Sequence, residues 1–201
     1  LQPMEGIGDL CQTYDCLLLL DTVTSLGAVP LKLDEWKVDL AYSCSQKGLS
    51  CPPGLGPFTM GPRAEAKLNA RSGKVPNWYL DVSLLNQYWG SNRVYHHTAP
   101  VNMNFGMREA LRLLAEEGIE NAWARHRSNS ERLWAGLEAL GLELHVPLER
   151  RLPTLTTVRI PEGVDGKAFS QHLLNKHGIE VGGGLGALAG DVARFQEVLT
   201  G

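Results

Sequence analysis

The sequence predicts an α/β fold, with a mostly parallel sheet followed by a small α+β unit. In the first half of the chain, short apolar runs of strand length alternate with helical periodicity, which is typical of a parallel sheet. In the second half, a long amphipathic pattern precedes an alternating segment and a further helical pattern. The 201 residues are 43% hydrophobic and 20% charged, which is ordinary for a folded globular chain.

The first half contains two predicted helices and three predicted strands. Ile7, Leu10 and Cys11 share one helical face, which predicts a helix over residues 5–16. The apolar run at 16–21 predicts a buried strand, and shorter runs predict strands at 38–42 and 58–60. A helix is expected over 62–71. Residues 72–100 carry few regular signals but many aromatic side chains, for which we expect packing in the core or between subunits.

Longer helices dominate the second half. Apolar spacing predicts helices over 101–117 and 119–140, separated by Gly118 and stopped by Gly141. Alternation predicts a strand over 154–160, followed by a helix over 165–177 and a short strand over 179–181. The long helix at 119–140 is the natural domain boundary, which predicts one domain over 1–118 and a smaller one over 119–201.

Composition excludes several classes of function. Nineteen basic and 22 acidic residues leave a net charge of −3, without the basic surplus of a nucleic-acid binder. The leucine run at 17–20 stops at Asp21, far short of the ~20 residues that span a membrane. The four cysteines form no CxxC pair, which favours free thiols in a reducing compartment. The neighbours His96 and His97 lack a third ligand, so no metal site is expected.

Polar side chains follow two of the predicted strands, where ligands bind in parallel sheets. Asp21 ends the first strand, and Lys47 comes shortly after the second. Alone, each has an ordinary explanation: an acid at a solvent-facing strand end and a surface lysine. Together they match pyridoxal 5′-phosphate (PLP) chemistry, which needs a lysine for a Schiff base and an acid against the pyridine nitrogen. The flanking hydroxyls of Ser43 and Ser45, with nearby amides, are candidates for holding the phosphate.

Several motifs in this order resemble the class V, fold-type I PLP-dependent aminotransferases. The most specific are DTVTSLG at 21–27, YSCSQKGL at 42–49 and PPG at 52–54, and further agreement lies at 79–81, 88–90, 95–101, 152–154 and 183–186. The resemblance is strongest to members that transfer the amino group of alanine or serine to glyoxylate, in glyoxylate detoxification. It covers the chain up to about residue 194.

The resemblance implies roles for residues at matching positions. Lys47 would be the Schiff-base lysine and would carry the proton of the amino-group transfer. Asp21 would pair with the pyridine nitrogen of PLP, Val23 would pack on the ring, and Gln46 would reach the phosphate.

The resemblance also implies a homodimer with a shared site. Tyr95 and Thr98 would bind the phosphate of the neighbouring subunit's cofactor.

Arg194 would hold the carboxylate of the amino acid or 2-oxo acid substrate, for which a guanidinium is well suited. Family members lie in peroxisomes or mitochondria, although this chain carries no recognisable targeting signal.

Two departures from the family pattern raise alternatives. The family has ~160 further residues before this start, compatible with a larger two-domain protein, and the chain after Arg194 does not follow its pattern. An expected alternative is therefore an incompetent fragment or isoform that at most associates with a full-length subunit. A third interpretation is a cysteine desulfurase, but that family has a histidine before its lysine, where Gln46 stands here.

Overall fold

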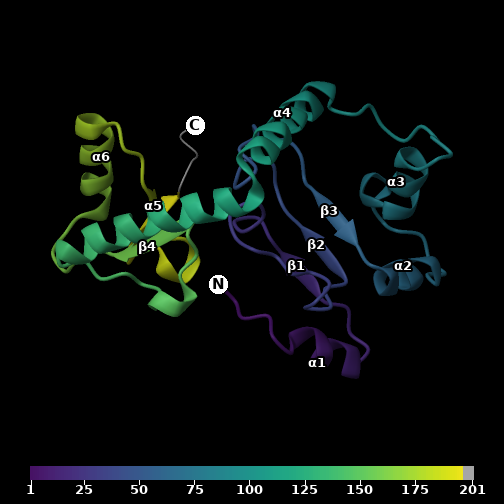
Figure 1. The fold of residues 1–201 in the computed structure, drawn as a ribbon, viewed down its shortest axis with the longest axis horizontal. Helices are drawn as coiled ribbons and strands as arrows, with labels where there is room; N and C mark the ends of the chain where they lie inside the picture. Colours follow the sequence, from purple (N-terminus) through teal and green to yellow (C-terminus); the bar gives the residue numbers. More distant parts are fainter. Residues whose placement is uncertain (197–201) are drawn as a thin grey trace.

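A computed structural model describes residues 1–196 as a mixed α/β chain with two three-stranded sheets (Figure 1). The α/β class predicted from the sequence is confirmed. The division into domains at 118/119 stays a prediction. The divergent tail expected after Arg194 falls mostly on residues 197–201, which lie outside the described residues.

The first sheet has the strand order β1-β2-β3. β1 (Leu19–Asp21) is parallel to β2 (Leu40–Tyr42), and the register places Asp21 opposite Tyr42. β3 (Phe58–Met60) is antiparallel to β2, so the sheet is mixed. All three strands were predicted, but the run at 16–21 is not buried throughout. Leu19 is 56% exposed, and β1 lies at the edge of this sheet, with no neighbouring strand on one side among the described residues.

The helices before residue 140 follow the predicted pattern with one addition. α1 (Ile7–Thr13) and α2 (Pro62–Asn69) lie inside the predicted ranges, and α4 (Val101–Glu117) matches its range. Gly118, with φ 84°, separates α4 from α5 (Ile119–Ala139). The unpredicted helix is α3 (Val82–Trp89), whose first turn is capped by the Asp81 carboxylate, which accepts the Ser83 N–H at 3.0 Å.

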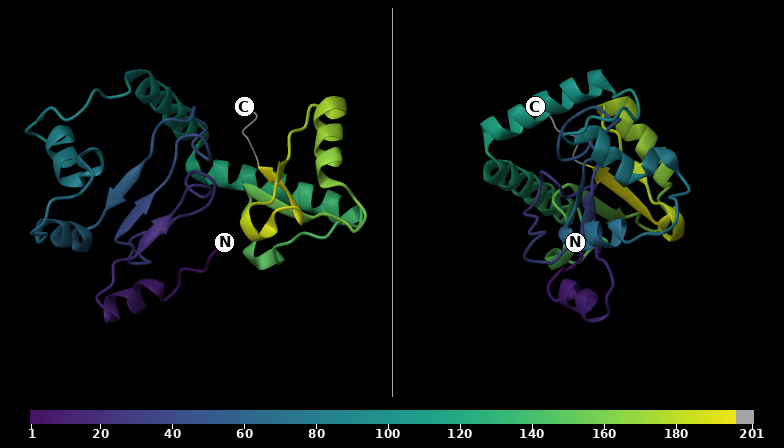
Figure 2. Two further views of the ribbon diagram at one scale, coloured as in Figure 1. Left: turned by 180° about the vertical axis from the view of Figure 1, so that it is seen from behind. Right: turned by 90° about the vertical axis from the view of Figure 1, so that its right-hand side faces the viewer.

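The second sheet is antiparallel, with the order β4-β6-β5. β4 (Leu155–Arg159) and α6 (Gly166–His177) were predicted, whereas β6 (Val192–Gln196) was not. The strand predicted at 179–181 is wrong, because β5 is formed by Gly182–Gly183. Figures 1 and 2 show α5 running along this sheet, where its side chains Trp134 and Leu137 are buried.

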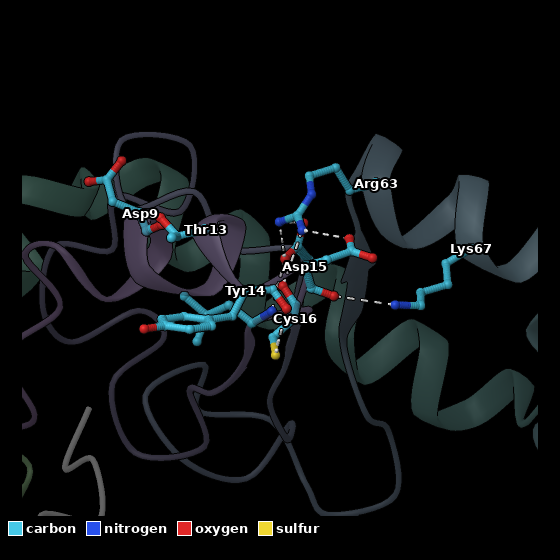
Figure 3. Close-up of polar contacts among 9 residues, drawn as sticks. Asp9, Thr13, Tyr14, Asp15, Cys16, Arg63 and Lys67 are labelled. Carbon is cyan, nitrogen blue, oxygen red and sulfur yellow. Dashed lines mark hydrogen bonds and ion pairs between the residues drawn. The ribbon is translucent and has the colours of Figure 1, made fainter.

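An arginine of α2 fixes the beginnings of β1 and β2. Arg63 Nη1 lies 3.0 and 3.2 Å from the two carboxylate oxygens of the buried Asp39, and its Nη2 donates to the Cys16 carbonyl at 3.1 Å (Figure 3). Asp39 also accepts the Leu18 N–H at 2.8 Å. Lys67 of α2 reaches the Asp15 carbonyl (Figure 3). These contacts hold the first sheet against α2 and thereby position the opposite, carboxyl ends of β1 and β2.

The aromatic segment before α4 is not part of the core. Trp78, Tyr79 and Trp89 are each more than half exposed, so the expectation that they pack in the core is wrong, and packing between subunits stays a prediction.

Short 3₁₀ turns occupy Trp78–Leu80, Leu148–Arg150 and Gly186–Leu188. Within residues 1–196, none of the helices has the length and apolar character needed to span a bilayer.

Candidate active site

The carboxylate of Asp21 is held at the carboxyl end of β1 by two donors. The Val23 N–H donates to Oδ1 at 2.8 Å, and the Tyr42 hydroxyl donates to Oδ2 at 2.7 Å. Asp21 is exposed, so its charge is solvated as well as hydrogen-bonded. The hydrogen bond to Asp21 raises the pKa of the Tyr42 hydroxyl above its ordinary value, with smaller contributions from desolvation and from the charge of the carboxylate. Asp21 therefore presents an oriented acceptor at this edge of the sheet.

Lys47 lies on a loop that folds back from the end of β2. The loop is closed by backbone hydrogen bonds from Ser43 to Pro57 and from Ser45 to Leu55, at 2.9 and 3.0 Å. The Ser45 backbone carbonyl also accepts the Cys51 N–H at 3.0 Å. Lys47 is half-buried within this closed loop, which restricts where its amine can reach.

Two glycines bring the Lys47 loop against the turn that follows Asp21. A Cβ on Gly27 would lie 2.6 Å from the Gly48 carbonyl oxygen, and a Cβ on Gly48 would lie 2.3 Å from the Leu26 carbonyl oxygen. The two backbones are therefore in direct contact, and Gly27 also has φ +86°. Since Gly48 follows Lys47 directly, this contact places Lys47 beside the turn that begins at Asp21. The structure thus brings the loop that carries the predicted lysine against the turn that follows the predicted acid.

We predict that Gly48→Ala loosens this contact. The added methyl group meets backbone rather than a flexible side chain, so one of the two loops must shift, at a cost of about 1–3 kcal/mol in the free energy of unfolding. Chemical denaturation measures the loss. Gly73→Ala is the matched control, because a Cβ there meets nothing within 4 Å, and it should change stability by less than about 0.5 kcal/mol. Equal stability of the two variants would contradict the loop contact.

The serine hydroxyls beside Lys47 have structural roles. Ser43 Oγ donates to the Thr22 carbonyl at 3.0 Å, and Ser45 Oγ donates to the Pro52 carbonyl at 2.7 Å. Both serines are buried, and Ser45 is fully so. The expectation that these hydroxyls hold a phosphate is therefore wrong, because their protons are already donated within the loop. The Gln46 side chain is exposed and remains a candidate phosphate ligand.

Tyr95 and Thr98 lie on the segment between α3 and α4, away from the end of β1 (Figure 1). Their hydroxyls are 3.0 Å apart, and Tyr95 is 73% exposed. The neighbouring His96 is buried and stacks on Trp78, with ring centroids 4.1 Å apart. The segment thus presents two paired, exposed hydroxyls beside the buried ring of His96.

Arg194 is placed by the second sheet. It lies on β6 opposite Thr157 of β4 and Gly182 of β5, and its Nε donates to the Gly183 carbonyl at 2.7 Å. Thr154, directly before β4, donates its hydroxyl to the Thr24 carbonyl at 2.5 Å. This hydrogen bond joins the second sheet to the turn that follows Asp21.

Tyr42 and Thr154 are site-associated residues to which the sequence reasoning gave no role. Tyr42 is the last residue of β2, and Asp21 is the last residue of β1. Because the two strands are parallel, their last residues lie side by side, and this was the available signal for Tyr42. Thr154 bonds to Thr24, which lies 130 positions earlier in the sequence, and no local sequence pattern predicts such a contact.

The residues present fit PLP. An oriented carboxylate, a half-buried lysine on the adjacent loop and an exposed amide beside it form the donor set that its ring nitrogen, aldehyde and phosphate need. Val23 follows Asp21 by two residues and is half-buried, which suits packing against an aromatic ring.

Comparisons with known proteins show the family of the chain. Residues 1–193 match the family described as Aminotransferase class-V. An alanine–glyoxylate aminotransferase of Callithrix jacchus is 45% identical over 199 residues, which are 97% of this chain and 48% of that protein. A (S)-ureidoglycine–glyoxylate transaminase of Bacillus subtilis is 37% identical over 213 residues, covering 97% of this chain and 51% of the relative.

A crystal structure gives the same result in three dimensions. That structure, of an alanine–glyoxylate aminotransferase from Nostoc sp., has a TM-score of 0.94 and 65% identity, and the match covers 97% of this chain and 52% of that one. The chain spans about half the length of the relatives it matches. With a family match over residues 1–193 and this structural likeness, the chain belongs to the class V aminotransferases, with the PLP-dependent fold type I.

Proposed function

We propose that the protein is a PLP-dependent aminotransferase that moves the amino group of alanine or serine to glyoxylate. The observation that carries the proposal is the contact between Gly27 and Gly48, which packs the Lys47 loop against the turn that follows the hydrogen-bonded Asp21. Class V aminotransferases depend on PLP and act on amino acids and 2-oxo acids. Both relatives described above carry glyoxylate in their names, which supports glyoxylate as the acceptor.

When bound, PLP supplies an electron sink for negative charge next to the amino-bearing carbon. Asp21 keeps a proton on the ring nitrogen by pairing with it, because a charged acceptor stabilises the protonated base. Val23 packs on the ring, and the Gln46 amide binds the phosphate. The Lys47 amine anchors the cofactor and then carries the proton of the substrate's α-carbon.

Arg194 is proposed to hold the substrate carboxylate. Pairing through Nη1 and Nη2 leaves the hydrogen bond from Nε to Gly183 intact, so the guanidinium stays fixed by β5 while it binds. The bridge from Thr154 to Thr24 sets this sheet against the turn that carries Val23. Residues of the second sheet would then hold the substrate carboxylate, and residues of the first sheet would hold the reacting carbon.

A homodimer is part of the proposal. The paired hydroxyls of Tyr95 and Thr98 would bind the phosphate in the site of a partner subunit, which accounts for the exposure of Tyr95. The peroxisomal or mitochondrial location implied by the resemblance stays a prediction.

The test is a titration of the purified protein with PLP, followed by transamination assays. We expect a saturable absorbance change near the visible edge, and formation of glycine from glyoxylate with alanine or serine as donor. A chain that binds PLP but turns over neither donor would favour the alternative, an incompetent subunit that associates with a longer one. Release of sulfur from cysteine would favour a desulfurase. Absence of any PLP binding at saturating cofactor would overturn the proposal.

A further inference from the structure

Tyr42 contacts the residue on which the proposed cofactor site depends. Its hydroxyl donates to Oδ2 of Asp21 at 2.7 Å, while the Val23 N–H donates to Oδ1 at 2.8 Å. Each carboxylate oxygen thus has its own donor, and the two donors lie on different elements. This arrangement fixes the plane of the carboxylate as well as its position, since one donor alone leaves it free to rotate.

The backbone holds Tyr42 rigidly in place for this contact. The Tyr42 carbonyl accepts the N–H of Thr22 at 2.9 Å and the hydroxyl of Thr22 at 2.7 Å. Thr22 is buried and directly follows Asp21. The donor and the acceptor of the side-chain hydrogen bond are therefore fixed to one another by two further hydrogen bonds between their strands.

The electrostatics keep Tyr42 in the form that donates. Asp21 raises the pKa of the Tyr42 hydroxyl, so the hydroxyl keeps its proton throughout the neutral range. The protonated hydroxyl therefore remains available as the donor to Oδ2 of Asp21.

From this geometry we propose that Tyr42 is a positioning residue, whose hydroxyl orients the Asp21 carboxylate toward the pyridine nitrogen of PLP. The proposal rests on the proposed function, because it assigns Tyr42 a role in the same site. A carboxylate has about four lone-pair positions, so the two donors leave acceptor capacity for the ring nitrogen. Without the hydroxyl, Asp21 must be ordered when the cofactor binds, which weakens binding.

The first test compares two cofactors on Tyr42→Phe. PLP and its 1-deaza analogue, which has carbon in place of the ring nitrogen, are titrated against the wild-type protein and the variant. We expect PLP to bind about three- to tenfold more weakly to the variant, the effect of losing one ordinary hydrogen bond. The affinity for the deaza analogue should not change, because it has no ring nitrogen for Asp21 to pair with.

The control is Tyr14→Phe, which removes a hydroxyl from a tyrosine that is 72% exposed after α1 and should leave both affinities unchanged. A merely structural role of Tyr42 would weaken both cofactors equally and would overturn the proposal. Equal affinity of wild type and Tyr42→Phe for PLP would overturn it as well.

The second test needs no cofactor. With ¹³C-labelled tyrosine, NMR titration of the wild-type protein should show the pKa of Tyr42 above that of an exposed tyrosine, and Asp21→Asn should lower it. An unshifted pKa of Tyr42 would show that its hydroxyl does not contact Asp21. That result would overturn the proposal even in a protein that binds PLP. If Tyr42 is shifted but the wild type binds no PLP, the proposed function fails and the positioning role with it, although the contact stands.

Discussion

Replacement of Lys47 by alanine is expected to abolish covalent capture of PLP and to reduce transamination at least about a thousandfold. The Gly27–Gly48 contact sets the Lys47 loop against the turn that follows Asp21, and alanine removes the amine proposed to anchor PLP and to carry the proton. A positioned acid or base contributes about 10²–10⁴-fold on its own, so loss of the two roles exceeds the lower end of that range. Borohydride reduction and mass spectrometry measure the captured cofactor, and the assay with alanine and glyoxylate measures turnover.

The control for Lys47→Ala is Lys74→Ala, on the exposed segment after α2. It should retain wild-type capture and turnover. Added ethylamine should restore part of the activity of Lys47→Ala, because a free amine supplies the missing proton carrier, and such rescue excludes misfolding as the cause. Cofactor fixed by borohydride at wild-type stoichiometry in Lys47→Ala would show that another residue is the attachment point.

Local periodicity was sufficient for most helices but not for the short strands. α4 and α6 lie where apolar spacing put them, because each has several turns of pattern and a glycine after its last residue. β5 is a pair of glycines, Gly182–Gly183, which carry no side chains to alternate. β6 exists through its pairing with β4, more than thirty residues earlier, and this pairing is not encoded in either segment alone.

The unpredicted α3 did have a signal. Asp81 stands where an N-cap is favoured, two residues before Ser83, and Leu84, Leu85 and Tyr88 follow at helical spacing. The surrounding aromatic residues concealed it, since they suit strands and cores as well as helices. The exposure of Trp89 shows that an aromatic side chain in a single chain does not by itself indicate burial.

The positions of Asp21 and Lys47 after neighbouring strands could be predicted from the sequence, whereas the contacts around them could not. Asp21 and Lys47 each follow a strand, and the rule for parallel sheets puts both at one edge. The donation of Ser43 to Thr22 depends on the register between β1 and β2, and that of Ser45 to Pro52 depends on the path of the loop. Strand register and loop path depend on packing, which the local sequence does not show. The two serines predicted as phosphate ligands therefore stabilise the loop instead.

Trp134→Ala is expected to give the largest loss of stability among the substitutions considered. Trp134 lies on α5 with 2% of its surface exposed, and its indole N–H donates to the buried Thr156 hydroxyl of β4 at 2.8 Å. Arg151 lies over the ring, 5.3 Å from its centroid. Truncation leaves a cavity between helix and sheet and an unpaired Thr156, at a cost of about 3–5 kcal/mol in the free energy of unfolding. Urea denaturation followed by far-UV circular dichroism measures it.

Two companion variants separate the causes of that loss. Trp89→Ala makes the same substitution at a side chain that is 64% exposed and should cost less than about 0.5 kcal/mol. Trp134→Phe keeps most of the packing but removes the hydrogen bond to Thr156, at a cost of about 1 kcal/mol. Equal losses for Trp134→Ala and Trp89→Ala would contradict the packing of α5 on the second sheet. Because β4 pairs with β6, which carries Arg194, a loosened sheet should also weaken binding of the substrate carboxylate while leaving PLP capture by Lys47 intact.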